Sequence, residues 1–141
     1  MKSAYMWRDI QRRADRYGIP IPVPAPYPVD ESEFANRVAI VGAGEGWCRA
    51  YTMATYRRWF QLGLEPGIEP NLSDGLREIG QDPSRVISVA RSDETGRALL
   101  AANDEAKSLG IFGVPTFVIG KEIFWGDDRL DDALRWARAT Q

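Results

Sequence analysis

Histidine is absent from this 141-residue sequence, and cysteine occurs once, as Cys48. A single cysteine excludes an intrachain disulfide and a Cys-x-x-Cys redox pair, and the lack of histidine excludes Cys/His zinc sites and Ser-His or Cys-His catalytic pairs. Chemistry is left to carboxylates, hydroxyls, Lys, Arg, the lone thiol, or backbone groups that act on a bound ligand. We therefore expect no metal site and interpret Cys48 as a buried, inert thiol.

Strong net charge and long apolar runs are also missing. The 18 Lys and Arg residues nearly balance the 20 Asp and Glu residues, so general attraction to nucleic acid or anionic lipid is not expected. No run approaches the ~18 apolar residues of a membrane span, and the residues after Met1 do not resemble a signal peptide. We expect a cytoplasmic protein, one compact domain, and a small-molecule partner.

Helical periodicity is present over most of the chain. Apolar residues recur at helical spacing in six segments, residues 4–17, 30–43, 47–62, 71–79, 83–90 and 93–109. Asp82 and Ser92 are the predicted N-caps of the last two. Five prolines between residues 20 and 28 predict an extended crossing without helix or central strand. The third segment carries large aromatic residues that we interpret as core or interface packing: Trp47, Tyr51, Trp59 and Phe60.

The pattern changes near the end of the chain. Residues 116–119 and 122–125 are short apolar, β-prone runs joined by a Gly-Lys pair, which predicts a hairpin. A final helix is expected after the hairpin, with Asp127 or Asp128 as its cap. The order is a long helical block, a hairpin and a helix.

The sequence GIFGVPTF at residues 110–117 carries the main functional signal. The Val114–Pro115 bond directly precedes a predicted strand, where a cis bond makes a tight corner, and we predict that it is cis. The N–H and C=O of Val114 would then turn away from their own sheet and could pair with an extended peptide, as an added strand does. A purely structural proline is the alternative interpretation.

A second signal lies where the last helix is expected to open. There, at Gly126 to Arg129, backbone N–H groups and the positive end of the helix dipole could receive a ligand carboxylate. An Asp side chain could hold an ammonium group. Main-chain pairing at one end and an amino-acid clamp at the other suit a γ-glutamyl tripeptide such as glutathione. For Asp127 and Asp128, an ordinary helix cap with favourable charge is the alternative.

These residues belong to a set of strings with a characteristic order and spacing. The strings are KSAYMWRDI at residues 2–10, YPV at 27–29, EGWC at 45–48, GIFGVPTF at 110–117 and FWGDDRL at 124–130. In this order the chain resembles the 2-hydroxychromene-2-carboxylate isomerase family, which is related to kappa-class glutathione transferases and DsbA-like thioredoxin folds. The resemblance covers almost the whole chain.

The resemblance implies an α/β, thioredoxin-like fold of the DsbA or kappa type, mostly helical. Residues 1–141 would form one truncated domain, with a large helical insertion at about residues 30–109 and a cis-proline loop, hairpin and helix at residues 110–141. The implied cofactor is glutathione. Val114, with Pro115, would pair with its cysteinyl unit, and Asp127 and Asp128, with Gly126, would hold its γ-glutamyl end. Tyr27 aligns with a tyrosine of the family's substrate pocket.

The sequence departs from the family at its start. Family members begin with a strand and a helix whose active-site serine stabilises the glutathione thiolate, and nothing similar precedes Lys2. The resemblance implies a glutathione-dependent cis-trans isomerase of aromatic degradation, but no catalytic residue is assigned, and we expect this chain alone to be inactive or nearly so.

The absent strands would pair with residues 116–119, and an unpaired edge is a liability. We therefore expect another chain, as in a homodimer, or the proline-rich segment to cover this edge. A non-catalytic fragment for dimerisation or binding and a kappa-like glutathione transferase are the competing interpretations.

Overall fold

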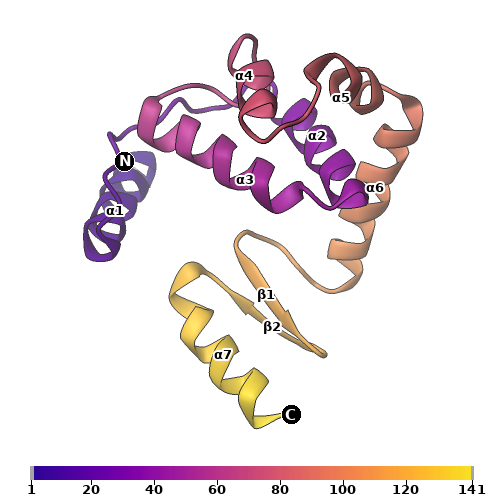
Figure 1. Ribbon diagram of the computed structural model, residues 1–141. Coiled ribbons are helices and arrows are strands. Elements are labelled where there is room, and N and C mark those ends of the chain that lie inside the picture. The colour runs from indigo at the N-terminus through magenta and orange to yellow at the C-terminus, as the bar shows by residue number, and fades with distance from the viewer. Residues whose placement is uncertain (1, 141) are drawn as a thin grey trace. The chain divides into compact units, whose positions relative to one another are not determined.

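The computed structural model describes residues 2–140, with only the backbone of Lys2. These residues divide into two compact units (Figure 1), one that extends to Gly96 and one that starts at Arg97. Helix α6 (Asp93–Ser108) contains the boundary between them. No helix of the described part has the length and apolar character needed to span a bilayer.

The first unit is helical. Its elements are α1 (Lys2–Tyr17), α2 (Ser32–Glu45), α3 (Cys48–Tyr56), the π-helical segment η1 (Arg57–Gln61), α4 (Asn71–Glu78) and α5 (Pro83–Ala90). Apolar spacing predicted each helix, and α5 agrees to the residue. The proline-rich crossing contains neither helix nor strand, as predicted. The continuous helix predicted over residues 47–62 is wrong at its end, where the backbone widens into η1.

Two predicted caps are confirmed. The Asp82 carboxylate accepts a hydrogen bond of 3.0 Å from the backbone N–H of Ser84, with a proline at the next position. The Ser92 hydroxyl accepts one of 3.2 Å from the N–H of Thr95 in the first turn of α6. Each bond satisfies a donor that the first helical turn leaves without a partner.

The core of the first unit lies between α2, α3, α4 and α5. Val38, Leu76 and Val86 are fully buried there, and Tyr51 is almost fully buried. These side chains come from four different helices, so their removal from water holds the helices together. The prediction that Tyr51 is a packing residue is confirmed.

An ion pair joins the end of α2 to α5. Arg85 donates to both carboxylate oxygens of Glu45, at 2.7 and 2.8 Å, and Trp47 Nε1 donates to the same group at 2.8 Å. These hydrogen bonds, that of Arg85 foremost, lower the pKa of Glu45 from 4.5 to about 2. The Trp47 ring lies against Gly42, where a Cβ atom would approach it to 2.8 Å. Trp47 therefore packs, as predicted.

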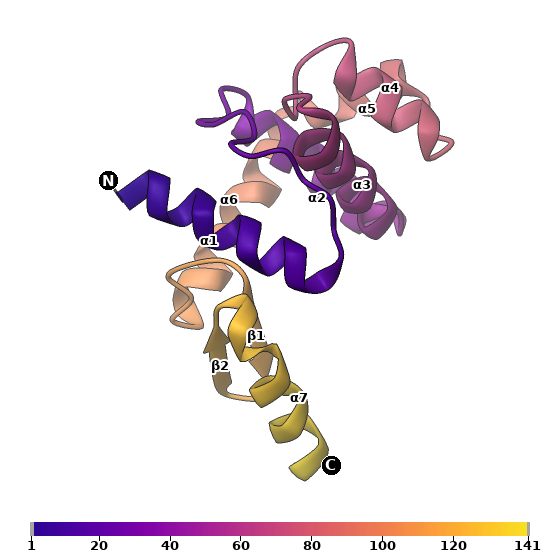
Figure 2. The ribbon, with the colours of Figure 1, turned by 90° about the vertical axis from the view of Figure 1, so that its left-hand side faces the viewer.

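The second unit contains the predicted hairpin. Strand β1 (Thr116–Ile119) pairs antiparallel with β2 (Glu122–Trp125), and helix α7 (Leu130–Ala139) lies against both strands (Figure 1, Figure 2). Phe117 pairs with Phe124, whose ring lies 6.5 Å from that of Trp136 in α7. Since side chains alternate across a strand, Val118 and Trp125 project from the other face.

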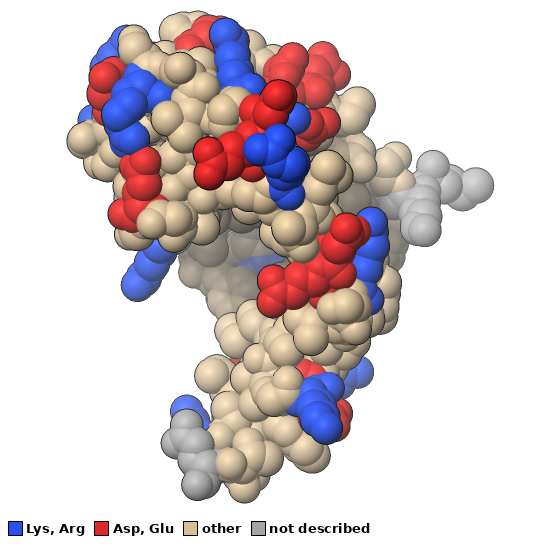
Figure 3. Space-filling model, turned by 90° about the vertical axis from the view of Figure 1, so that its right-hand side faces the viewer, with Lys and Arg blue, Asp and Glu red and all other residues tan. Residues whose placement is uncertain are grey.

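This sheet has two strands in the described part of the chain, so each strand has one edge without a strand partner. The surface drawn in Figure 3 carries Lys and Arg side chains interspersed with Asp and Glu. That distribution agrees with the net charge of −2. Neither sign of charge gathers into one large patch on this face.

Candidate functional site

The corner before β1 exposes main chain. The Val114–Pro115 peptide bond is cis, as predicted. The Val114 residue is 88% exposed, the largest exposed fraction among the large hydrophobic residues that the structure describes. An apolar side chain so far from any packing contact indicates that this residue is presented to solvent rather than held in a core.

The hydrogen bonds around the corner leave the polar groups of Val114 unused. The Pro115 carbonyl accepts a bond of 2.9 Å from the N–H of Gly126, and the Thr116 hydroxyl donates one of 2.6 Å to the Gly113 carbonyl. Within residues 2–140, neither the N–H nor the C=O of Val114 pairs with another backbone group. One donor and one acceptor are thus available to an extended peptide.

Two aromatic rings lie beside this corner and were not predicted from the sequence as site residues. The Phe112 and Trp125 rings contact each other with centroids 5.0 Å apart, yet they are 72% and 54% exposed. A Cβ atom on Gly113 would lie 2.5 Å from Trp125 Nε1, so only glycine permits this approach. The sequence signal that could have indicated this contact is Gly113, which lies between an aromatic residue and the Val-Pro pair.

Gly126 connects the corner to the acidic turn that follows β2. Its N–H donates to Pro115, and its carbonyl accepts a bond of 3.1 Å from the N–H of Arg129. Its φ of +111° is a conformation that residues with a Cβ atom rarely adopt. A Cβ atom here would also lie 2.5 Å from Asp128 Oδ1. Backbone conformation and space both require glycine at this position.

The predicted cap by Asp127 or Asp128 is wrong. A 3-10 turn, η2 (Asp127–Arg129), precedes α7, and neither element has a side-chain cap. The N–H groups of Arg129 and Leu130 already donate to the carbonyls of Gly126 and Asp127. The tighter 3-10 hydrogen bonds satisfy donors that a capped helix would leave for a side chain or ligand. Fewer donors therefore face a ligand carboxylate than the sequence suggested.

Acidic groups dominate the turn. Both Asp127 and Asp128 are exposed, whereas the neighbouring Arg129 binds Asp132 at 3.0 Å. Hydrogen bonds from Arg129 and then Arg135 lower the pKa of Asp132, and the bond to Asp132 raises the pKa of Arg129. Two exposed carboxylates within one turn suit a ligand's ammonium group.

The remaining predicted residues lie in the first unit. Tyr27 is exposed, and its ring meets that of Trp7 edge-on at 6.1 Å, beside a hollow along α1. Cys48 is half-buried, so the prediction of a buried thiol is wrong. The structure therefore brings together five predicted residues, and it places Tyr27 in the other unit. These five are Val114, Pro115, Gly126, Asp127 and Asp128.

The arrangement can bind a short peptide that has a free amino end. Its parts are main-chain pairing at Val114, the exposed rings of Phe112 and Trp125, and two carboxylates. Among the described residues no group of three or more His, Cys, Asp or Glu side chains is placed to hold a metal ion.

Comparison with known proteins gives consistent matches. The profile of the DSBA-like thioredoxin domain matches residues 1–135. Proteins named 2-hydroxychromene-2-carboxylate isomerase from Sphingobium xenophagum and Pseudomonas putida are 28% and 29% identical over 130 residues, 92% of this chain. A solved 2-hydroxychromene-2-carboxylate isomerase structure superposes with a TM-score of 0.85 at 29% identity and covers 99% of this chain.

The match is partial on the side of the relatives. The aligned region spans 65% and 63% of the two named proteins and 66% of the solved chain. The described residues thus correspond to about two thirds of each relative. The fold predicted from the sequence, thioredoxin-like of the DsbA type with a C-terminal hairpin and helix, is confirmed.

Proposed function

The chain belongs to the DSBA-like thioredoxin domain family, and on that premise we propose that it binds glutathione for an isomerisation of the 2-hydroxychromene-2-carboxylate type. The names of its relatives support the reaction class. The observation that carries the proposal is the exposed Val114 with its unpaired N–H and C=O. This donor and this acceptor could pair with the main chain of a bound tripeptide.

Each part of the site has a separate task in this proposal. The N–H of Val114 donates to the main chain of the cysteinyl unit, and its C=O accepts from it. Asp127 and Asp128 hold the ammonium of the γ-glutamyl end by charge-assisted hydrogen bonds. Gly126 fixes the distance between these two contacts through its bond to Pro115. Glutathione, when bound, would supply a thiolate that adds to an unsaturated substrate, permits bond rotation and leaves.

We also propose that these 141 residues do not isomerise substrate at the full rate by themselves. In this proposal Val114 and the aspartates position the tripeptide, and no role in stabilising its thiolate is assigned to them. A group that lowers the pKa of the thiol is therefore not assigned among Val114, Asp127 and Asp128. Tyr27 is the proposed contact for the aromatic substrate.

The binding experiment is calorimetric titration of the chain with glutathione and with Cys-Gly, which lacks the γ-glutamyl end. We expect glutathione to bind more tightly than Cys-Gly. The double variant Asp127→Asn/Asp128→Asn should reduce the ratio of the two affinities about tenfold, because the charge-assisted bonds to the ammonium group are lost. Asp131→Asn, in the first turn of α7, is the matched control and should change nothing. Equal affinity of the unaltered chain for both peptides would contradict the proposed clamp.

One observation favours a second function. The edge of β1 has no strand partner among the described residues, and the rings of Phe112 and Trp125 are exposed beside it. We propose as the alternative that this edge pairs with a second copy of the chain in a homodimer without catalysis. Sedimentation equilibrium distinguishes the two, because only the alternative predicts a dimer whose stability does not depend on glutathione.

A further inference from the structure

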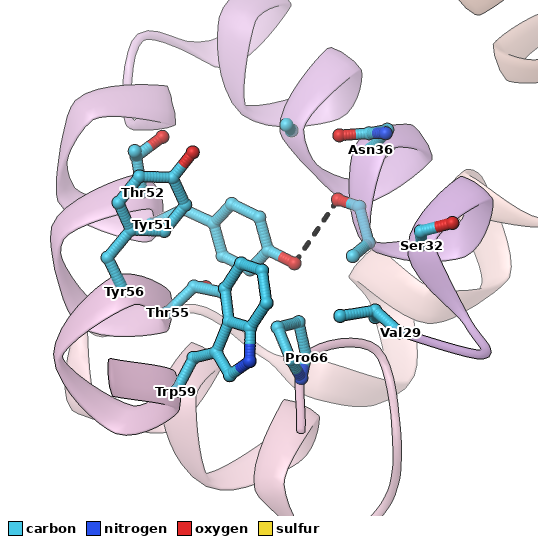
Figure 4. A pocket seen from close by; sticks show the side chains of 11 residues that line it. Val29, Ser32, Asn36, Tyr51, Thr52, Thr55, Tyr56, Trp59 and Pro66 are labelled. Carbon is cyan, nitrogen blue, oxygen red and sulfur yellow. Dashed lines mark hydrogen bonds between the residues drawn. The ribbon is translucent and has the colours of Figure 1, made fainter. Parts of the chain in front are cut away.

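A cavity of about 230 Å³ lies between α2 and α3 in the first unit (Figure 4). Helix α2 and the residues before it form one wall, and α3 with η1 forms the other. Its lining residues are Val29, Ser32, Ala35, Asn36, Ala39, Tyr51, Thr52, Thr55, Tyr56, Trp59 and Pro66. None of them belongs to the site at Val114.

Tyr51 forms the base of the cavity. Tyr51 is almost fully buried, and its hydroxyl donates to the Ala35 carbonyl at 3.2 Å, the bond drawn in Figure 4. Behind it lies the core that joins α2 to α5. A ligand would therefore meet a fixed aromatic surface here rather than a side chain that must first be ordered.

Trp59 supplies the second aromatic surface. Its Nε1 donates to the Pro26 carbonyl at 2.8 Å, so the polar edge of the indole is already bound and an apolar face remains. The Tyr56 ring meets it edge-on at 6.2 Å. Trp59 lies on η1, and π-helical turns occur frequently at functional sites because they change the direction of a side chain.

Both walls carry polar groups that bind no other part of the protein. The side chains of Ser32, Asn36 and Thr52 make no hydrogen bond to other described residues. Figure 4 shows Ser32 and Asn36 on α2, across the cavity from Thr52 on α3. No lining residue is a Lys, Arg, Asp or Glu. The cavity thus offers amide and hydroxyl groups but no counter-charge.

We propose that this cavity binds a small, uncharged aromatic molecule that carries a hydroxyl or carbonyl group. Aromatic rings prefer edge-on or offset contact with Tyr51 and Trp59, and the polar substituent would pair with Asn36 or Thr52. A charged ligand is disfavoured because its charge would lose water without gaining a partner. The site extends beyond the glutathione function proposed above and rests on none of its residues.

The test is a titration of the full chain with 2-naphthol, followed by 1H–15N NMR. We expect saturable shifts at the side-chain amide of Asn36, the backbone of Thr52 and the indole N–H of Trp59. The charged probe 2-naphthoate should bind at least tenfold more weakly. Shifts confined to the exposed rings of Phe112 and Trp125, or equal binding of both probes, would overturn the proposal.

Two alanine variants sharpen the result. Asn36→Ala should weaken 2-naphthol binding about three- to tenfold, as the loss of one hydrogen bond does. Asn103→Ala, on the exposed surface of α6, is the matched control and should leave binding unchanged. Equal affinity of Asn36→Ala and the unaltered chain would remove Asn36 from the site. A loss of affinity in both variants would show that the effect does not come from the cavity.

Discussion

The backbone N–H of Gly126 lies 2.9 Å from the carbonyl oxygen of Pro115, and this bond joins the two parts of the proposed glutathione site. It continues the hairpin past the last paired residues, Thr116 and Trp125. The acidic turn is therefore held at a fixed position relative to the exposed main chain of Val114. A site for an extended tripeptide requires this fixed spacing.

Gly126→Ala should disturb both parts of the site. Its Cβ atom would meet Asp128 Oδ1 at 2.5 Å, and the residue would have to hold a φ of +111°. We expect a loss of about 1–3 kcal/mol in the free energy of unfolding and weaker glutathione binding, measured by urea unfolding and calorimetry. Gly44→Ala is the control, since its Cβ atom meets nothing within 4 Å. Equal stability of both variants would contradict this account.

Gly113→Ala should displace the Trp125 indole, because the new methyl group would lie 2.5 Å from Nε1. We expect a shifted indole N–H resonance for Trp125 and a destabilisation of less than about 1 kcal/mol, because the exposed indole can move into solvent. NMR of the variant separates this signal from those of the other four tryptophans. An unchanged Trp125 resonance would show that the close approach of Gly113 does not exist in solution.

The pair Glu45–Arg85 should make stability depend on pH. The pKa of Glu45 is lowered to about 2 in the folded chain, from an ordinary value of 4.5. A depressed carboxyl pKa stabilises the folded state above pH 4.5, and this contribution is lost as the pH falls toward 2. Glu45→Gln should therefore destabilise at pH 7 but not at pH 2, measured by denaturant unfolding at both values.

A control separates this pair from general charge effects. Glu105→Gln changes the net charge by the same amount on the exposed face of α6. It should leave the pH dependence of unfolding as it is in the unaltered chain. Parallel pH profiles for Glu45→Gln and the unaltered chain would disprove the stabilising role of the ion pair.

Leu76→Ala tests the core of the first unit. Leu76 is fully buried in the core between α2, α3, α4 and α5, so the truncation leaves a cavity and should cost about 2–5 kcal/mol of unfolding free energy. Leu100→Ala makes the same chemical change at an exposed position of α6 and should cost less than about 0.5 kcal/mol. If thermal unfolding gives similar losses of unfolding free energy for the two variants, Leu76 does not belong to the core.

The helices and the hairpin could be predicted because apolar spacing and turn residues determine them locally. Pro83–Ala90 follows from an aspartate cap, a proline at the first position and an apolar stripe. The π-helical turn at η1 could not be predicted, since its hydrogen bonds span only one residue more than those of an α-helix. Its Trp59 also bonds to the Pro26 carbonyl, a contact between residues far apart in the sequence that local patterns do not indicate.

The site was predictable where a motif acts through its own backbone. Val-Pro before a strand indicated the exposed corner, whereas the approach of Trp125 to Gly113 joins residues twelve positions apart. The conformation of Gly126 and the 3-10 turn after it also depend on contacts between distant residues, namely the pairing of β1 with β2. For this reason the donors expected at Asp127 were overestimated from the sequence.

The most direct test of the account is a 1H–15N NMR titration of the chain with glutathione. We expect the Val114 amide to shift most, because it gains a hydrogen bond, and the amides of Asp127 and Asp128 to shift with the same dissociation constant. Saturating glutathione that leaves the Val114 amide unmoved, or that shifts it with a different constant from the two aspartates, would contradict a single tripeptide site at this corner.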